Sequence, residues 1–315
     1  AADMAEMVKK ATRESFGETV TALAAEYPEI VVLDADLAAA TKTGIFKKAY
    51  PERFFDCGIA ECNMVGVAAG LATCGKIPFA ASFAMFSAGR AFEQVRNSVG
   101  YPKLNVKIVG SHAGISVGED GATHQCCEDI ALMRTIPGMV ILNPSDDIEA
   151  KAAVKAAYEH EGPVYMRFGR LAVPIINDRP DYKFEIGKGV TLREGKDVAI
   201  IATGLCVSES LAAAEKLAAD GIDAKVINIH TIKPLDEDLV VAAAKECGKV
   251  VTVEEHSVIG GLGSAVCETL SRKAPTPVKT IGVQDCFGES GPAVALLEKY
   301  GLNAEGIYAS VKDFV

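Results

Sequence analysis

One acidic side chain and two aromatic rings flank a glycine-rich segment in the first third of the chain. Glu61 directly precedes the run CNMVGVAAGLATCG, Phe83 ends the next apolar run, IPFAASF, and Phe86 follows shortly after it. A carboxylate at the start of a helix is either a first-turn charge that the helix dipole favours or a catalytic acid. The two phenylalanines are either core residues, as such pairs usually are, or the wall of a ligand pocket.

A second group of side chains that could bind a ligand or transfer a proton lies in one loop, HAGISVGEDGATHQ. The apolar strand NVKIVGS precedes this loop, so His112, Asp120 and His124 should follow the carboxyl end of a buried strand. Open α/β sheets bind their ligands at such ends. Loop histidines are surface side chains in most proteins, and a ligand site is the alternative here. We expect no metal site, because no third ligand has a suitable spacing.

Alternating strands and helices are needed to position both groups, and the first half of the sequence predicts them. We expect strands at 30–34, 77–83, 105–111, around MVILN and at 164–168. We expect helices at 4–26, from Cys62 or Asn63 to Gly75, at 87–99, at 126–135, and from Ser145 as N-cap with Asp146 and Asp147 in the first turn. The helix after Glu61 consists mostly of Gly, Ala, Val and Leu, so it should be buried on nearly every side.

The periodicity fails between Leu171 and Lys196, where prolines, charges and a probable hairpin predict an interdomain linker. A second α/β unit follows. Its strands are expected at 198–203, 224–229, 250–255 and 278–283, and its helices at 206–220, 236–246 and 263–273, with one or two more after Gly291. The sequence therefore predicts two domains, 1–172 and 191–315 with a linker at 173–190, each a mainly parallel sheet covered by helices.

Three glycines, Gly260, Gly261 and Gly263, open one helix of the second unit. A turn of this kind can hold a phosphate at the helix N-terminus. It can equally allow a helix to pack closely against a strand, and the pattern alone does not decide between these two functions.

Composition excludes several classes of protein. The chain has 315 residues, 49% of them hydrophobic and 23% charged, and a net charge of -10, which indicates a globular protein with no basic surface for nucleic acid. No apolar run is long enough to cross a membrane, because Lys76 interrupts the best candidate, and the N-terminal residues lack the apolar core of a signal peptide. Nine cysteines without a CxxC pair suggest reduced thiols and a cytoplasmic location.

Seven segments together resemble the second half of a transketolase, a thiamine diphosphate enzyme. They are TRESF, DADL, CGIAECNMVGVAAGL, SFAMF, SHAGISVGEDGATHQ, RFGR and VEEHSVIGGLGSA, of which GEDGATHQ is the most distinctive. The resemblance covers nearly all of the chain and implies a pyrimidine-binding domain, a linker and a transketolase C-terminal domain. The GDG motif, through which such enzymes bind Mg²⁺ and the diphosphate, is absent from the sequence. The resemblance therefore implies the C-terminal subunit of a split transketolase, with a separate N-terminal subunit that carries GDG and Mg²⁺.

The resemblance also implies roles for the residues that bind the cofactor. Glu61 matches the glutamate that bonds to the far ring nitrogen of the aminopyrimidine and favours its imino tautomer, a base for the cofactor's C2 proton. Phe86 matches the aromatic residue that stacks on the pyrimidine, and Phe83 lines the same pocket. Gly89 stands where transketolases have a tyrosine.

Further matches concern the substrate, a sugar phosphate. Arg13 and Arg170 match arginines that clamp the phosphate, and His112 helps to hold it. Asp120 and His124 contact substrate hydroxyls, and His124 is counted with Glu61 as catalytic. The family's phosphate-binding serine is replaced by Ala40, a loss that Thr41, Lys42 or Thr43 is expected to offset.

Two other functions remain open at this point. One is the β subunit of a 2-oxo-acid dehydrogenase or half of a deoxyxylulose-phosphate synthase, although His112 and His124 around GEDG favour sugar substrates and pentose phosphate metabolism. The other is a non-catalytic partner subunit that retains only the fold. For the assembly, we expect a homodimer through the helix around Met64 to Ala72, a heterotetramer with the N-terminal subunit, and weak cofactor binding by this chain alone.

Overall fold

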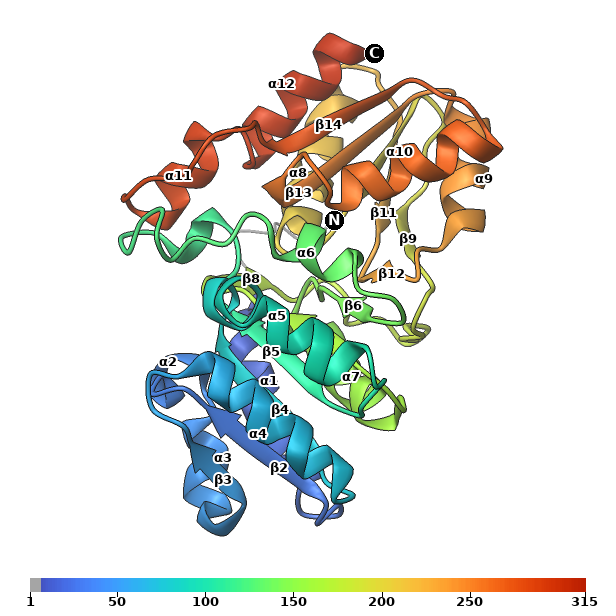
Figure 1. Cartoon of the computed structure of the whole chain (residues 1–315). Helices are drawn as coiled ribbons and strands as arrows, with labels where there is room; N and C mark the ends of the chain where they lie inside the picture. Colours follow the sequence, from blue (N-terminus) through green and yellow to red (C-terminus); the bar gives the residue numbers. More distant parts are fainter. Residues whose placement is uncertain (1–6) are drawn as a thin grey trace.

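Two parallel-rich sheets, one above the other in Figure 1, organise the computed structural model, which describes residues 7–315. The first sheet has seven strands in the order β12-β6-β7-β5-β4-β2-β3, and the second has five in the order β14-β13-β10-β11-β9. Strand β12 is antiparallel to β6 and β9 is antiparallel to β11, whereas the other neighbours within these two sheets run parallel. The predicted fold class, two mainly parallel α/β units, is therefore confirmed.

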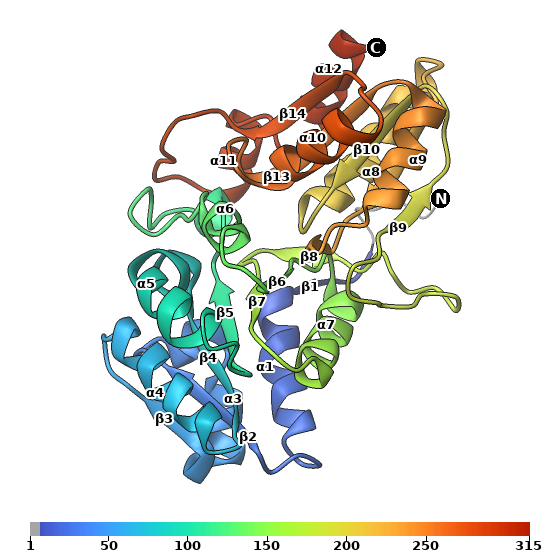
Figure 2. The same cartoon turned by 45° about the vertical axis from the view of Figure 1, so that its right-hand side comes forward.

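The lower unit in Figure 1 is built from the first half of the chain. Its parallel strands are β2 (Ile30–Asp34), β3 (Phe54–Asp56), β4 (Ile77–Phe83), β5 (Lys107–Ser111), β6 (Val140–Leu142) and β7 (Val164–Arg167). Its α-helices are α1 (Thr12–Leu23), α2 (Ala38–Thr41), α3 (Gly44–Ala49), α4 (Glu61–Thr73), α5 (Phe92–Gln94), α6 (Asp129–Arg134) and α7 (Asp147–Glu159). In Figure 2, α4 and α5 cover one face of the sheet and α1 and α7 the other.

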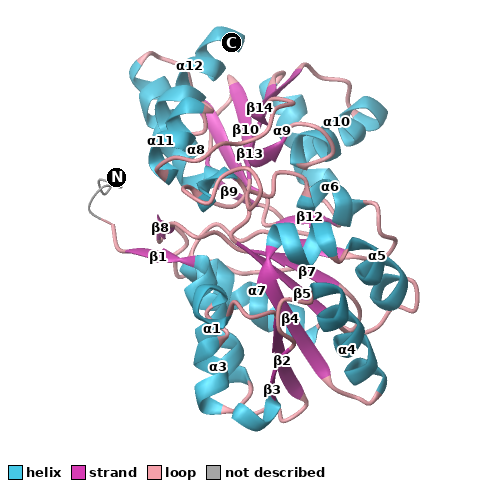
Figure 3. Ribbon diagram, turned by 60° about the vertical axis from the view of Figure 1, so that its left-hand side comes forward, coloured by secondary structure: helices cyan, strands magenta, loops and turns pink. Residues whose placement is uncertain are grey.

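The upper unit has the same layered construction, as the colouring by secondary structure in Figure 3 shows. Its strands are β9 (Val190–Arg193), β10 (Val198–Ala202), β11 (Ala224–Asn228), β13 (Val250–Ser257) and β14 (Val278–Val283). Its helices are α8 (Cys206–Ala219), α9 (Glu237–Cys247), α10 (Leu262–Lys273), α11 (Ala293–Lys299) and α12 (Ala304–Phe314). Helices α8 and α12 pack together, as do α9 and α10. None of the described helices is long and apolar enough to span a membrane.

The linker region contains no hairpin, contrary to the prediction. Its first strand, β8 (Ala172–Pro174), pairs with β1 (Lys9–Ala11), and its last, β9, pairs with β11. The pairing with β8 also explains why α1 begins only at Thr12: residues 9–11 are strand and not helix as expected, and residues 4–6 of the expected helix lie outside the described residues. Both partners are far away in sequence, so local periodicity could not reveal them.

Several other local expectations were wrong in detail. The expected helix at 87–99 consists of two π-helical segments, Met85–Arg90 and Val95–Gly100, on either side of α5. Over one or two turns, apolar spacing does not distinguish α- from π-helical winding, and π-segments are frequent at functional sites. Helix α7 is capped by Asp146, whose Oδ1 accepts from the Glu149 N–H at 2.9 Å, and not by Ser145.

Helix α4 is buried on one face only, which corrects the expectation of burial on nearly every side. Met64, Val65, Ala68 and Ala69 pack inward, while its opposite face is exposed in the single chain. The exposed residues are Asn63, Gly66, Val67, Gly70 and Thr73. The composition predicted an apolar helix, but it could not tell which of its residues the chain's own sheet buries.

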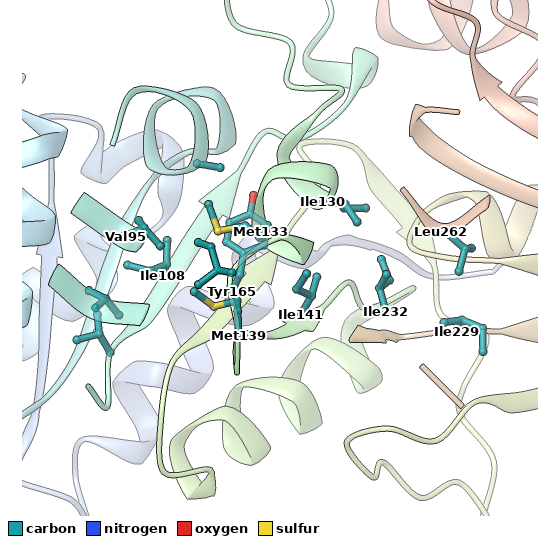
Figure 4. Close-up of a cluster of buried hydrophobic side chains, with 14 of the residues drawn as sticks. Val95, Ile108, Ile130, Met133, Met139, Ile141, Tyr165, Ile229, Ile232 and Leu262 are labelled. Atoms are coloured by element: carbon teal, nitrogen blue, oxygen red, sulfur yellow. The ribbon is translucent and has the colours of Figure 1, made fainter. Parts of the chain in front are cut away.

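A hydrophobic core extends across the boundary between the two units. Ile229 and Ile232 on the β12 side and Leu262 of α10 belong to the same cluster as Ile130 and Ile141 of the lower unit (Figure 4). Strand β12 (Thr231–Lys233), although it follows β11 in the upper unit, completes the edge of the lower sheet. The carboxyl ends of β4 and β5 and the segments that follow them face this boundary (Figure 1), and these segments hold four of the predicted site residues, Phe86, His112, Asp120 and His124.

Candidate active site

Three aromatic side chains stack where strands β4 and β5 end. The ring centroids of Phe83 and Phe86 are 5.9 Å apart with an interplanar angle of 11°, and His112 stacks on Phe83 at 3.9 Å. His124 meets the two phenylalanines edge-on, at 6.3 Å and 5.4 Å. The structure thus brings together four residues from two separate motifs of the sequence, SFAMF and SHAGISVGEDGATHQ.

His112 is held in one tautomer by its two neighbours. Its Nε2 lies 3.1 Å from Nη1 of Arg13, and its Nδ1 lies 2.9 Å from Oγ of Ser111. A guanidinium can only donate, so Nε2 must accept and Nδ1 must carry the proton that Ser111 receives. Burial, followed by the positive charges of Arg13, Arg170 and Lys42, lowers the pKa of His112 to about 3. The imidazole is therefore neutral at any physiological pH.

A cluster of positive charge surrounds that imidazole. Nη1 of Arg13 also donates to the carbonyl of Ala40 at 2.8 Å, while the buried Nε of Arg13 has no hydrogen-bond partner in residues 7–315. Burial lowers the pKa of this guanidinium, and the nearby charge of Arg170 lowers it further. Arg170 donates through Nη1 to the Val117 carbonyl and, at 2.9 Å, to Glu119 Oε2. Clustered cations with an unused donor favour an anionic ligand.

The loop after β2 offers fewer phosphate donors than expected. Oδ2 of the buried Asp34 accepts from Oγ1 of Thr41 at 2.7 Å and from Oγ1 of Thr43 at 2.8 Å. Both hydroxyls are themselves buried, so they cannot replace the serine that Ala40 displaces. Of the three residues expected to do so, only Lys42 extends to the surface, where its Nζ lies 3.4 Å from Glu14 Oε1.

Glu61 is the first residue of α4 and is 3% exposed. Its side chain makes no capping bond to the helix, and its Oε2 is buried without a hydrogen-bond partner in the described chain. A buried polar atom without a partner costs about 1–3 kcal/mol, more when it is charged. Glu61 thus lies in the first turn of α4, where the helix dipole favours a carboxylate. The dipole alone does not explain the orphaned oxygen, which fits a ligand that donates a hydrogen bond, as an aminopyrimidine held at its ring nitrogen would.

Asp120 differs from the other predicted site residues. It is exposed, and within residues 7–315 its side chain makes no hydrogen bond or ion pair. Its neighbour His124 is partly exposed, and Nδ1 of His124 lies 2.9 Å from Oγ1 of Thr123. These two side chains are positioned to meet a ligand from outside, whereas His112 is buried behind them.

Beside Gly89, the side chain of Met85 occupies part of the wall of the pocket. A Cβ atom on Gly89 would overlap the methyl group of Met85, so the thioether occupies space that a larger residue at 89 would need. Met85, Phe86 and Gly89 line a groove of about 760 Å³ whose far side is residues 285–288 of the upper unit. Methionine is flexible and suits an irregular apolar wall.

The glycine-rich turn before α10 binds no external phosphate in this arrangement. Glu254 Oε2 accepts from the Leu262 N–H at 2.7 Å, and its Oε1 accepts from the Gly263 N–H at 2.8 Å. The carboxylate thus occupies the anion position at the helix N-terminus. A Cβ atom on Gly261 would overlap Glu254, so close packing explains this glycine.

Sequence reasoning missed a set of buried charges behind the loop. Arg167 Nε donates to Asp129 Oδ2 at 2.8 Å, and Tyr165 donates its hydroxyl to the same oxygen at 2.7 Å. Glu255 Oε1 accepts from the Ser116 N–H at 2.5 Å. The available signal was the presence of charged residues within otherwise apolar strands, in PVYMRFGR and VVTVEEH.

The fold and this site together define a two-domain α/β protein whose site offers clustered cations and a buried carboxylate to a ligand. The family model described as "Transketolase, pyrimidine binding domain" matches residues 8–175, and the one described as "Transketolase, C-terminal domain" matches residues 187–307. The chain belongs to the transketolase family. It corresponds to the C-terminal section of a split enzyme, as its relatives indicate.

Three similar proteins are described as a section, a subunit or a split-gene form of a transketolase. The "Putative transketolase C-terminal section" of Methanocaldococcus jannaschii is 52% identical over 308 residues, which are 97% of this chain and 96% of that protein. A 6-deoxy-6-sulfo-D-fructose transketolase subunit of Clostridium sp. (strain MSTE9) is 48% identical over 301 residues, 96% of this chain and 93% of its own. A solved split-gene transketolase, described as an inactive β4 tetramer, is 56% identical with a TM-score of 0.89, covering 96% of this chain and 97% of its own.

Proposed function

We propose that this chain is the pyrimidine- and substrate-binding subunit of a thiamine diphosphate-dependent transketolase, which moves a two-carbon ketol unit from a ketose phosphate to an aldose phosphate. The observation that carries the proposal is the buried Oε2 of Glu61, which has no hydrogen-bond partner among residues 7–315. A scaffold subunit would have no use for that costly group. The relatives named as transketolase sections or subunits support ketol transfer over the synthase and dehydrogenase alternatives.

Each residue of the cofactor site has a distinct proposed role. When bound, thiamine diphosphate supplies the nucleophilic carbon for ketol transfer. Glu61 would hold the far ring nitrogen of the aminopyrimidine, in a pocket whose low polarity strengthens that bond. Phe86 would stack on the ring, and Phe83, fixed between Phe86 and His112, would keep that stacking surface in place and exclude water.

At the substrate end of the site, we propose that one set of residues binds the phosphate and another set binds the hydroxyl groups of the sugar. Arg13, Arg170 and Lys42 would neutralise the phosphate, with His112 held behind them as a neutral acceptor. His124 has one ring nitrogen next to Thr123, which leaves the other for a substrate hydroxyl, and Asp120 would accept from another hydroxyl. His124 is thereby the group able to hold or move a proton at that hydroxyl.

The proposal requires a second subunit. We infer that an N-terminal transketolase subunit with the GDG motif binds Mg²⁺ and the diphosphate, and that the complete enzyme acts on soluble sugar phosphates in the cytoplasm. The donor and acceptor sugars are best found by purifying the chain together with its partner and assaying ketol transfer from a panel of ketose phosphates. Absence of transfer with every member of the panel, in a complex that binds the cofactor, would refute this function.

Cofactor affinity should depend strongly on that partner. In calorimetry, we expect the chain alone to bind thiamine diphosphate and Mg²⁺ too weakly to measure, and the assembled complex to bind with micromolar or tighter affinity. The reason is that the pyrimidine pocket offers only part of the contacts, while the charged diphosphate needs the metal. Micromolar binding by the isolated chain would contradict the division of the site between two subunits.

The exposed face of α4 is the proposed homodimer contact, and heterotetramers would form when the partner binds. A Cβ atom on Gly66 meets nothing within 4 Å in the single chain, and leucine is a better helix former than glycine. Gly66→Leu should therefore leave the fold intact while it breaks the dimer and abolishes activity. Light scattering and a thermal melt check both statements.

The matched control for this prediction is Lys245→Leu, which adds the same side chain to an exposed position on α9. This variant should remain dimeric and active. A wild-type chain that is monomeric at micromolar concentration, or a Gly66→Leu variant that stays dimeric, would show that the α4 face is covered in some other way.

A further inference from the structure

Two adjacent glutamates on β13 serve different parts of the molecule. Glu254 caps α10 within the upper unit, as described above. Glu255 reaches in the other direction, across the boundary, and accepts a hydrogen bond from the Ser116 N–H at 2.5 Å. Ser116 belongs to the loop that carries Asp120 and His124, so a side chain of the C-terminal domain contacts the base of the predicted substrate loop.

The loop backbone fits closely around that carboxyl group. Gly114 has a φ of +79°, a conformation that favours glycine, and a Cβ atom there would overlap the carboxyl group of Glu255. The Gly114 N–H also donates to the Cys126 carbonyl at 2.8 Å, which closes the loop on itself. Residues 114–126 are thus anchored at their base, at the point where Glu255 contacts them.

No bulk water is available to replace this contact. Glu255 is 3% exposed and lines a small cavity of about 20 Å³, which has room for a single water, together with Ser116, Asn143 and Arg167. Ser116 Oγ and Asn143 Nδ2 have no hydrogen-bond partner in residues 7–315. Burial raises the pKa of Glu255 to about 7, although the Arg167 charge acts in the opposite sense.

Other contacts from the C-terminal domain support the far end of the loop. Gln125 donates through Nε2 to the Glu289 carbonyl at 2.9 Å, and the Ser257 N–H donates to the Cys127 carbonyl at 2.7 Å. Arg167 donates through Nη2 to the main-chain carbonyl of Glu255 at 2.8 Å, which fixes β13 against the lower unit. Of the hydrogen bonds described here, the one that Glu255 accepts is made to the part of the loop before Asp120, where Ile115 also packs into the apolar core of the upper unit.

We propose that Glu255 is a positioning residue, through which the C-terminal domain sets the place of Asp120 and His124 against the aromatic stack and so determines affinity for the sugar. This proposal rests on the proposed function for its kinetic consequence. Its structural consequence, a loop held by the bond to Ser116, is independent of activity.

Three substitutions at Glu255 test the proposal in the full chain and in its complex with the partner subunit. Glu255→Met keeps the length of the side chain but removes the acceptor, and Glu255→Asp keeps the carboxylate but withdraws it by one methylene. Both should raise the KM for the ketose phosphate about tenfold to a hundredfold, with a smaller change in kcat, because misplacement of about 1 Å costs up to about 10²-fold. Glu255→Gln retains an oxygen that can accept from Ser116 and should restore KM to within about threefold of wild type.

Amide hydrogen exchange on the isolated chain gives a second readout that requires no catalysis. Exchange of residues 115–125 should be at least about tenfold faster in Glu255→Met than in wild type, and close to wild type in Glu255→Gln. Glu254→Met is the matched control, since it removes an equally buried carboxylate from the same strand. It should lower the melting temperature without changing KM or loop exchange.

The outcomes separate the possible errors. Unchanged KM and exchange in Glu255→Met, or in Glu255→Asp if the methionine variant does not fold, would overturn the positioning role. An equal rise in KM for Glu254→Met would show a general loss of stability instead. If the wild-type complex transfers no ketol unit while loop exchange responds as expected, the proposed function fails and the positioning of the loop stands.

Discussion

Glu61→Ala is expected to reduce ketol transfer by the assembled enzyme about 10³-fold or more, with the chain still folded. Positioned acid–base groups contribute about 10² to 10⁴ in rate, and this carboxyl group would act on the ring that generates the reactive carbon. Its Oε2 is buried without a partner in the described chain, so its removal takes away an uncompensated polar atom and should not lower the free energy of unfolding. Steady-state assay and thermal denaturation check the two statements.

Glu61→Gln serves as the control for this prediction. It keeps the shape of the side chain and a hydrogen-bonding group, so it should retain more cofactor affinity than the alanine variant while it still turns over slowly. A Glu61→Ala variant with wild-type activity would contradict the assignment. If the wild-type complex itself binds no thiamine diphosphate, the non-catalytic alternative becomes the better description.

Arg13→Met is expected to raise the KM for the phosphorylated substrate about 10²-fold and to leave an unphosphorylated ketose almost unaffected. The guanidinium lies at the centre of the positive cluster, with Nη1 between the Ala40 carbonyl and His112 and a buried Nε that has no partner in the described residues. A hydrogen bond to a charged group contributes about 1.5–3 kcal/mol, which corresponds to this change in affinity. Comparison of the KM values of the two substrates measures it.

Arg53→Met is a suitable control, because Arg53 is also largely buried but donates to the carbonyls of Ala24 and Tyr27, at the far end of α1. This variant should lose stability and keep both KM values. In Arg13→Met the pKa of His112 should rise, since one of the charges that lower it is removed. Equal increases of KM for phosphorylated and unphosphorylated sugars would show that Arg13 supports the loop and does not bind phosphate.

The pattern of apolar and polar residues over short stretches was sufficient to predict most of the helices and strands. Runs such as EIVVLD and NVKIVGS are apolar and bounded by turns, so the strands at 30–34 and 107–111 lie where they were expected. The pairing of β1 with β8 and the crossing of β12 into the lower sheet were missed, because each depends on a partner far away in sequence. Strands β1, β8 and β12 have only three residues each, too few to show the alternation of apolar and polar side chains.

The sequence predicted four residues that the structure brings together, Phe83, Phe86, His112 and His124, but it did not predict the contacts of the site, and the roles of its residues stay predictions. The motifs placed His112 and Arg13 near one phosphate, yet only the structure shows that Arg13 donates to His112 and fixes its tautomer. Thr41 and Thr43 looked available in sequence, and the buried Asp34 engages both hydroxyls. The side chains of Glu254 and Glu255 point to opposite faces of β13, as neighbours on a strand do. This alternation does not tell which groups each carboxylate contacts.

Strand β12 has a consequence for how this protein can be divided. Although it belongs to the second half of the sequence, it hydrogen-bonds to β6 and completes the edge of the first sheet, next to a core that both halves share. A chain cut between residues 175 and 187 would leave β6 with an open edge, and open edges invite aggregation. We therefore expect the two domains to unfold together and not one after the other. A division between these two domains would cost the first sheet its edge strand β12.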